Sequence, residues 1–357
     1  AASDTKKRKA DQVNALPNSP DKYPDDLEAQ AFLALAMYNN VKAKKNYDDI
    51  EKRIAKILIK NPNHPCHHYR IHLWDYKDAK RAIPSIGLCG QSAEGIAHMW
   101  HMPSHILSRL KRYHDATWQQ EASARVDHAH MMRDRIMPDR IHNFAHNNEW
   151  LTRNLSHSGR ISQAIAMSIN MIELPRIPRV KEDGTWSFPS RSSHYYGRRH
   201  LYDLLKNYEL WGKVINLKDS HYLKPDKTAY NQAKYWRIVA SAYANTGEVV
   251  FANELLNKMN NLLNNQKAGK IKAGKEAEEK AKKEKKKPND IKKAKSGAER
   301  PYSSAITVLE RGIAETKMYL AIKAEKIEEA KTQYAKVRDF RAERKALLQL
   351  SFGNQEE

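Results

Sequence analysis

Residues 157–164 read HSGRISQA, in which a polar turn with Gly159 ends one helical sequence and Ala164 opens the next. Three further stretches share the pattern, 110–116 (LKRYHDA), 245–252 (NTGEVVFA) and 324–330 (AEKIEEA). A small residue at this place lets two helix backbones approach closely. The pattern therefore predicts antiparallel helix pairs that repeat along the chain.

Helical periodicity flanks these turns along most of the chain. In 47–60 (YDDIEKRIAKILIK) four aliphatic residues fall on one helix face, namely Ile50, Ile54, Ile57 and Leu58. Strand-like alternation is almost absent, and the clear non-helical stretch is 175–191, which holds three prolines and a glycine. The helix pairs resemble the tetratricopeptide repeat (TPR). We therefore predict an all-α fold, a TPR-like α-solenoid of antiparallel helix pairs, with a generic helical bundle as the alternative.

Charge and sequence breaks predict the domain organisation. The chain carries 63 Lys and Arg against 42 Asp and Glu, a net charge of +21, and 267–300 holds 14 basic and 6 acidic residues. That stretch has few apolar residues to bury, so we predict a linker, with a solvated helix or a polyanion-binding arm as alternatives. The expected parts are a basic, partly disordered N-terminal segment 1–25, His-rich TPR-like repeats 26–174, an irregular loop 175–191, further repeats 192–265, a Lys-rich linker 266–300 and a C-terminal helical hairpin 301–350.

Composition also bounds the environment of the protein. No apolar run approaches the about 18 residues of a membrane span, so we expect none. Cys66 and Cys89 are too few for a disulfide framework or a Cys-rich zinc module. One disulfide bond between these two cysteines is possible, although buried structural thiols are the favoured interpretation. The sequence opens at Ala1 without Met, which we interpret as an exported, periplasmic product, a segment of a longer chain being the alternative.

Three histidine pairs have matching spacing. The pairs, each four residues apart, are His68 with His72, His101 with His105, and His142 with His146. The first pair precedes the second by 33 residues, and the second precedes the third by 41, so the pairs fall at corresponding places in successive repeats. In a solenoid the first helices of successive repeats stack about 10 Å apart and line the concave surface. We therefore expect the pairs to converge there.

Imidazole is a good ligand for zinc and copper, so the pairs predict a metal site. The predicted metal-binding residues, with two additions from the same stretches, are His68, His72, His98, His101, His105, His142, His146 and Glu149. The expected cofactor is a divalent transition metal, zinc or copper. The alternative is that these histidines are hydrogen-bonding residues of a core or a peptide-binding groove.

The same residues carry a resemblance to a family. HHYRIHLWD (67–75), HMWHMPSHILSRLKRY (98–113) and IHNFAHNNEWLTRNLSHSGR (141–160) are similar to a family of bacterial TPR proteins that carry HYxIH followed by HxxHMPSH. The resemblance covers about residues 20–265, and its motif positions are His68, His72, His98, His101 and His105. Some relatives are joined to thioredoxin-like or peroxiredoxin-like domains. The resemblance implies a TPR fold and an exported redox or metal context, and supplies no established activity.

Three functions compete at this stage. The leading interpretation is a TPR-like scaffold whose concave groove binds a metal ion and a protein or peptide partner, for which the resemblance suggests a redox protein. The second is a metal-dependent hydrolase or oxidoreductase with Glu149 as general base, although no HExxH, GxSxG, GxxxxGK[ST] or GxGxxG motif is present. The third is a polyanion or nucleic-acid binder that uses 267–300.

Overall fold

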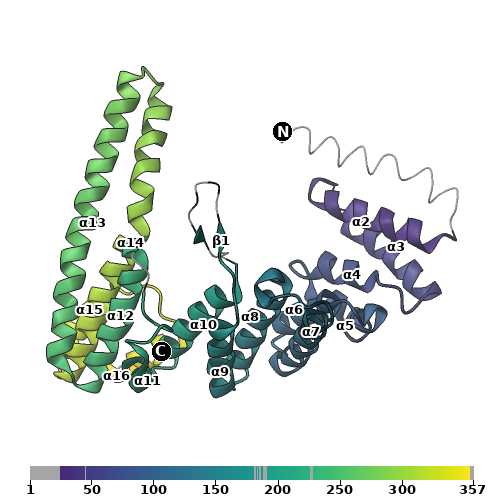
Figure 1. The fold of residues 1–357 in the computed structure, drawn as a ribbon, viewed down its shortest axis with the longest axis horizontal. Coiled ribbons are helices and arrows are strands. Elements are labelled where there is room, and N and C mark those ends of the chain that lie inside the picture. Colours follow the sequence, from purple (N-terminus) through teal and green to yellow (C-terminus); the bar gives the residue numbers. More distant parts are fainter. Residues whose placement is uncertain are drawn as a thin grey trace. The chain divides into compact units, whose positions relative to one another are not determined.

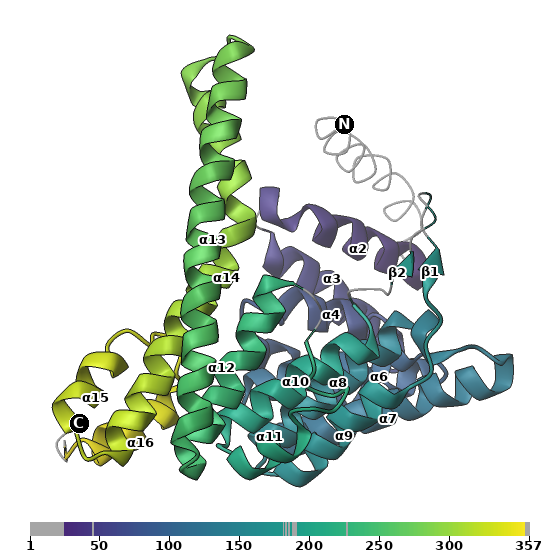
Figure 2. The same ribbon diagram turned by 60° about the vertical axis from the view of Figure 1, so that its left-hand side comes forward.

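The computed structural model describes residues 25–44, 46–180, 182, 184, 186–187, 191–225 and 228–353. Within these residues the chain is almost entirely helical, so the predicted all-α class is confirmed (Figure 1, Figure 2). The chain divides into two compact units, 1–200 and 201–357, with the boundary inside helix α10. The predicted segment 1–25 lies, apart from residue 25, outside the described residues.

The first unit is a succession of helices with one small ladder of strands. Its elements are α2 (Leu27–Lys44), α3 (Tyr47–Lys60), α4 (His67–Trp74), η1 (Ala79–Ala82), α5 (Ile83–Cys89), η2 (Gln91–Ala93), α6 (Ala97–Arg109), α7 (Tyr113–Asp134), η3 (Pro138–Arg140), α8 (His142–His157), α9 (Ile161–Glu173), β1 (Arg179–Val180), β2 (Trp186–Ser187) and most of α10 (Ser193–Asn207). The two strands pair antiparallel, with Arg179 opposite Ser187. This ladder lies inside the stretch 175–191 that the sequence predicted to be irregular.

The apolar face predicted for 47–60 forms part of the core of the first unit. Ile50, Ile54, Ile57 and Leu58 on α3 are all buried. They join one cluster with Ile71 and Trp74 of α4 and with Met99, Met102 and Ile106 of α6. Because α4 and α6 bury these residues, the opposite faces of the two helices are left for polar side chains.

One turn geometry recurs at five helix pairs of the described chain. A residue with positive φ stands two positions before the second helix of each pair: Lys111, Gly159, Glu209, Gly247 and Glu325. The next N–H donates to a carbonyl five residues back, as Arg160 does to Leu155 and Glu248 to Tyr243. The alanines picked out in the sequence are fully buried in the second helices: Ala116, Ala164, Ala252 and Ala330. The predicted helix-pair turns are therefore present.

The second unit is built around two long helices. Its elements after α10 are α11 (Trp211–Leu217), α12 (Ala229–Thr246), α13 (Val249–Lys283), α14 (Pro288–Lys323), α15 (Ile327–Tyr334) and α16 (Ala342–Ser351). Helices α13 and α14 run side by side (Figure 1, Figure 2). The hairpin predicted for 301–350 contains a third helix, because the chain leaves helical conformation between α15 and α16.

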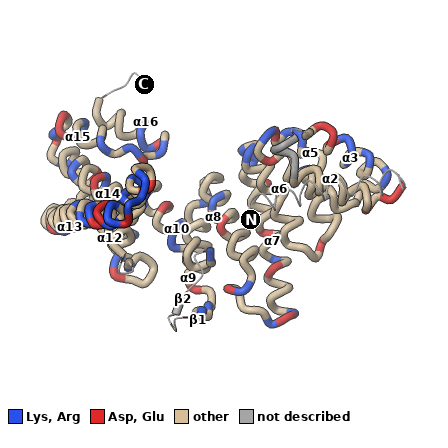
Figure 3. Tube along the Cα trace, turned by 90° about the horizontal axis from the view of Figure 1, so that it is seen from above, with Lys and Arg blue, Asp and Glu red and all other residues tan. Residues whose placement is uncertain are grey.

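The Lys-rich stretch 266–300, predicted to be a linker with a solvated helix as an alternative, is helical except for a short turn, and it ends α13 and begins α14. Basic and acidic residues occur together on these helices (Figure 3), and Glu278 pairs with both Lys282 and Lys295. The two helices also approach closely at Gly269, where the Tyr302 ring occupies the space of a Cβ. The prediction considered only apolar burial and missed these contacts. Polyanion binding by this stretch stays a prediction.

A buried ionic network joins three parts of the second unit. The Arg237 guanidinium of α12 donates to Glu315 of α14 at 2.6 Å and, through two bonds of 2.8 Å, to Asp339 in the segment before α16. Lys206 lies 3.5 Å from Glu315. These residues stabilise the packing of the C-terminal segment. No helix in the described part of the chain has the length and apolar character of a membrane span.

Candidate metal centre

Six histidines of the first unit gather into two groups of three. His68, His72 and His98 form the first triad, and His101, His105 and His146 form the second. Within each triad one ring nitrogen per histidine lies within 4.8 Å of the others. Two of the predicted pairs stay together, one in each triad, with α6 adding His98 to the first triad. The third pair is divided, since His146 of α8 joins the second triad and His142 joins neither.

The second triad contains a close contact between two imidazole nitrogens. His101 Nε2 and His105 Nε2 are 2.8 Å apart, and the His101 ring lies 4.7 Å from the His105 ring and 4.8 Å from the His146 ring. His101 is completely buried. The contact between the two nitrogens therefore lies in the protein interior.

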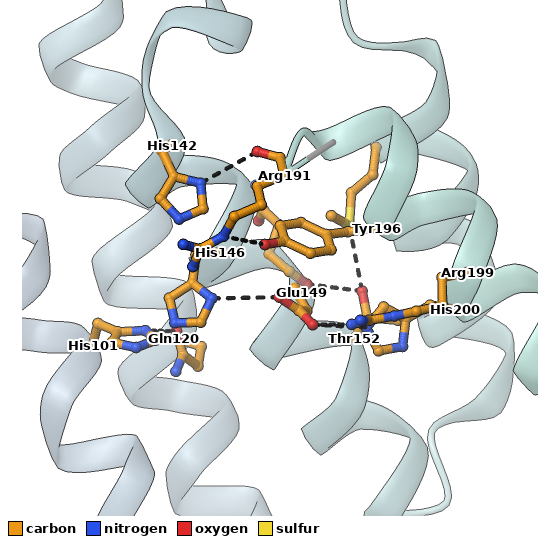
Figure 4. Close-up of polar contacts among 12 residues, drawn as sticks. His101, Gln120, His142, His146, Glu149, Thr152, Arg191, Tyr196, Arg199 and His200 are labelled. Atoms are coloured by element: carbon orange, nitrogen blue, oxygen red, sulfur yellow. Dashed lines mark hydrogen bonds and ion pairs between the residues drawn. The ribbon is translucent and has the colours of Figure 1, made fainter. Parts of the chain in front are cut away.

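The neighbours of His101 decide which of its nitrogens carries the proton. Ser104 Oγ donates to the His101 carbonyl oxygen at 2.8 Å and accepts from Gln120 Nε2. The Gln120 amide is thereby oriented with Oε1 towards His101 Nδ1, at 2.9 Å (Figure 4). Because Oε1 only accepts, His101 Nδ1 must donate. The lone pair of a neutral His101 is then on Nε2, which faces His105.

Carboxylates hold the other two rings in the same way. Asp75, which is only 3% exposed, lies 3.2 Å from His105 Nδ1 and 2.5 Å from Arg109 Nε. Glu149 lies 3.4 Å from His146 Nδ1 and also pairs with Arg199 (Figure 4). Acceptors at Nδ1 leave Nε2 as the free ligand atom, an arrangement typical of metal-binding histidines.

The first triad is more open in its hydrogen bonding. The His68 ring lies 4.5 Å from His72 and 4.9 Å from His98. His68 Nε2 is buried and has no hydrogen-bond partner among the described residues. His98 is hydrogen-bonded to Asn143, which donates to Asp127 at 3.1 Å. A buried nitrogen without a partner is costly unless something binds it.

Burial favours the neutral form of five of these six imidazoles. It lowers the pKa of His68 to about 3 and that of His72 to about 4, and neighbouring histidines add to the effect. Burial also lowers the pKa of His101 well below its ordinary value. Neutral imidazole is the form that ligates a metal. Both triads can therefore compete with protons for an ion at neutral pH.

Trp150 covers the second triad. Its ring stacks on His105 at 4.2 Å with an interplanar angle of 25°, and it meets His101 and His146 edge to face. Sequence reasoning passed over this residue, although it stands four positions after His146 on α8. Helical spacing alone could have placed it beside the predicted ligands.

Two of the predicted ligands lie outside the triads. His142 Nδ1 lies 3.3 Å from the Arg191 carbonyl oxygen (Figure 4). Glu149 contacts His146 and is engaged by Arg199, so its position is that of an orienting carboxylate. His98, added to the prediction from the same stretch, is a full member of the first triad.

The partners of the ligands were missed for two different reasons. Asp75 follows His72 by three residues, so helical spacing could have placed it beside that histidine. Gln120 and Asn143 come from α7 and α8, and nothing in the sequence links them to α6. The cysteines agree with the favoured interpretation: Cys66 and Cys89 are free and buried, and burial raises the pKa of both thiols to about 12.

Comparisons with known proteins do not extend this description. No protein-family model matches the chain, and no curated protein is significantly similar to it. The resemblance to bacterial TPR proteins is therefore carried by the sequence motifs alone, and the candidate site by its geometry.

Proposed function

We propose that this chain is a TPR-like helical-repeat protein that binds a divalent transition-metal ion through His101, His105 and His146. The observation that carries the proposal is the 2.8 Å approach of His101 Nε2 to His105 Nε2. Gln120 and Asp75 engage the Nδ1 atoms of these rings, so two lone pairs face each other when both rings are neutral. Such a contact requires an electrophile between or beside the two nitrogens.

A metal ion accounts for more of the site than a proton does. A second proton on the His105 ring would allow a hydrogen bond to His101 Nε2. That bond would not involve the nearby His146 ring. A metal ion uses all three rings, since their ligand atoms lie within 4.8 Å of one another. Two imidazole nitrogens on one tetrahedral ion stand about 3.3 Å apart. Binding therefore needs only a small widening of the existing contact.

The ligand chemistry favours zinc or copper. The three candidate ligand atoms are imidazole nitrogens, which suit both metals, and no carboxylate oxygen belongs to the group. Zinc takes about four ligands, so three histidines leave one position open. That open position favours a metal-dependent enzyme as the second candidate function, with Glu149 orienting His146 instead of acting as a general base.

The recurring turn supports the TPR-like part of the proposal. Five helix pairs share a residue of positive φ before the second helix, and four of them bury an alanine in that helix. Small residues at helix contacts are typical of TPR repeats. The HYxIH and HxxHMPSH motifs point to the same family. A scaffold of this kind presents a groove for a protein or peptide partner, which remains part of the proposal.

Metal titration tests the function directly. Chain stripped with a chelator is titrated calorimetrically with Zn²⁺ and Cu²⁺, alongside His101→Ala, His105→Ala and the control His128→Ala, whose exposed histidine lies on α7 outside both triads. We expect the two triad variants to lose a stoichiometric site that the control keeps, with helicity unchanged by circular dichroism. Wild-type chain that binds neither ion stoichiometrically would refute the proposal.

A further inference from the structure

The first triad has the features of a site in its own right. His68 and His72 stand on one face of α4, and His98 of α6 completes the group. The ring centroids are 4.5 to 6.1 Å apart. His68 Nε2 is buried and has no hydrogen-bond partner among the described residues, so this nitrogen is available to bind a ligand inside the protein. No carboxylate belongs to the group.

The two triads are adjacent because one turn of α6 contributes a histidine to each of them. His98 and His101 are three residues apart on α6, and their rings stack at 5.7 Å with an interplanar angle of 18°. Each ring belongs to a different triad. An ion bound to imidazole at about 2.0–2.1 Å lies about 3.2 Å from the ring centroid, so ions in both triads would be at most about 12 Å apart.

The protein groups around the triads supply too little negative charge to neutralise two bound divalent ions. All six candidate ligands are histidines, and imidazole contributes no negative charge when it ligates an ion. The two carboxylates that contact ligand rings are already engaged by cations, Asp75 by Arg109 and Glu149 by Arg199. Two divalent ions would therefore keep most of their positive charge, and each would have three protein ligands. An added anion would offset part of the positive charge of the ions and would occupy an open coordination position.

We propose that the six histidines bind two transition-metal ions side by side, one in each triad, each with a position left for an exogenous anion. The inference rests on the proposed function, because it takes the second triad as one of the two sites. It adds a second ion, places it next to the first, and names the chemical class of the remaining ligand. It makes the first unit a paired-metal centre.

Copper provides the test, because Cu²⁺ is paramagnetic. Stripped chain is loaded with one and then two equivalents of Cu²⁺ and measured by electron paramagnetic resonance. We expect two bound ions, with dipolar broadening and a half-field signal that grow as the second equivalent is added. Azide added to the loaded chain should produce a new copper charge-transfer band, which reports an open position.

Variants of each triad assign the two ions. His72→Gln and His98→Asn should each bind one copper with an isolated spectrum, as should His101→Ala, while the control His128→Ala keeps two coupled ions. Since the wild-type measurement needs no substitution, a variant that fails to fold does not decide the outcome.

Several results would overturn the inference. One copper in wild-type chain, removed by His101→Ala, would leave the proposed function standing and refute the second ion. Two ions without magnetic interaction would refute their adjacency, and two ions retained in both His72→Gln and His98→Asn would refute the first triad as a site. If azide produced no new charge-transfer band in copper-loaded chain, the inference that each ion has an open coordination position would be refuted. No bound copper at all would refute the proposed function as well.

Discussion

A few contacts fix the orientation of the His101 ring in the proposed metal site. His101 is completely buried, its Nδ1 is engaged by Gln120, and its Nε2 faces His105. Gln120 is itself held by Ser104, so the ring orientation is fixed before an ion arrives. Ordered outer contacts of this kind raise metal affinity because less reorganisation is required on binding.

Gln120 is the residue whose replacement isolates this effect. We expect Gln120→Met to weaken zinc binding about 10–100-fold, because the His101 ring loses the acceptor that fixes its tautomer. Gln120→Glu keeps an acceptor at the same place and should retain more of the affinity. Competition with a chromophoric chelator measures both. Equal affinities for wild-type chain and Gln120→Met would show that Gln120 does not orient a ligand.

The buried histidines also predict how stability depends on pH. Burial lowers the pKa of His68 to about 3 and that of His72 to about 4, below the ordinary value of about 6.5. Below pH 6.5 the unfolded chain therefore binds protons that the folded chain does not, so the free energy of unfolding falls as the pH drops. Asp127 and Glu209 oppose this, because burial raises the pKa of Asp127 to about 6 and that of Glu209 above its ordinary value. The histidines whose pKa burial lowers are more numerous.

Thermal melts of metal-free chain between pH 7.5 and 5 should therefore show a falling midpoint. In this window most carboxylates stay ionised, so the histidines dominate the change. His72→Gln removes one of the titrating groups and should show a shallower fall. A midpoint that is constant or rises towards pH 5 would contradict the assignment of neutral, buried imidazoles.

The two thiols give a simple check of burial. Cys66 and Cys89 are completely buried, and the raised pKa of about 12 leaves almost no thiolate at neutral pH. We expect no reaction of native chain with a water-soluble disulfide reagent within minutes, and two thiols per chain to react after denaturation. Rapid labelling of native chain would place at least one thiol at the surface.

The sequence predicted which histidines come together better than how they are grouped. Helical spacing identified His68, His72, His101 and His105, because residues four apart share a helix face. It could not assign His98 and His146 to different triads, since that depends on how α4, α6 and α8 pack. It placed Glu149 as a ligand or base, whereas Arg199, fifty residues later, engages that carboxylate.

The recurring turn is the feature that defines the helix pairs. Gly159 and Lys111 occupy the same position of this turn with φ of 77° and 59°. Glycine adopts this conformation without strain, whereas an L side chain does not. Alanine spacing predicted the turns, but nothing in the sequence indicated that Lys111 would adopt positive φ.

The two turns make opposite predictions for matched substitutions. Gly159→Ala should lower the free energy of unfolding by about 1–2 kcal/mol, and Lys111→Gly should raise it by up to about 1 kcal/mol. No atom lies within 4 Å of the place of a Cβ at Gly159, so the effect there is one of backbone conformation. Denaturant titration measures both. Two changes of the same sign would show that the turns differ in conformation.

The long helices α13 and α14 show what composition alone could not predict. Their Lys-rich ends have few apolar residues, and on that ground the stretch 266–300 was predicted to be a linker. Pairs such as Glu278 with Lys282 and close contacts such as Gly269 with Tyr302 depend on the partner helix. Such contacts across a hairpin have no local signature in the sequence.

At the scale of the whole molecule, the fold class followed from periodicity and the division into units did not. Helical spacing over most of the chain predicted the all-α class, which the described residues confirm. The boundary between units falls inside α10, whereas the sequence prediction divided the chain at the loop 175–191 and at the Lys-rich stretch. Both triads lie in the first unit, so the proposed metal chemistry belongs to residues 1–200.

X-ray absorption at the zinc K-edge tests the central claim most directly, because it reports the atoms around the ion. Chain loaded with one equivalent of Zn²⁺ should show a shell of nitrogen and oxygen atoms at about 2.0–2.1 Å, with the outer scattering of three imidazole rings and no sulfur at about 2.3 Å. In His101→Ala the amount of zinc bound at saturation should fall by one equivalent per chain. A shell without imidazole scattering, or one that contains sulfur, would contradict the account.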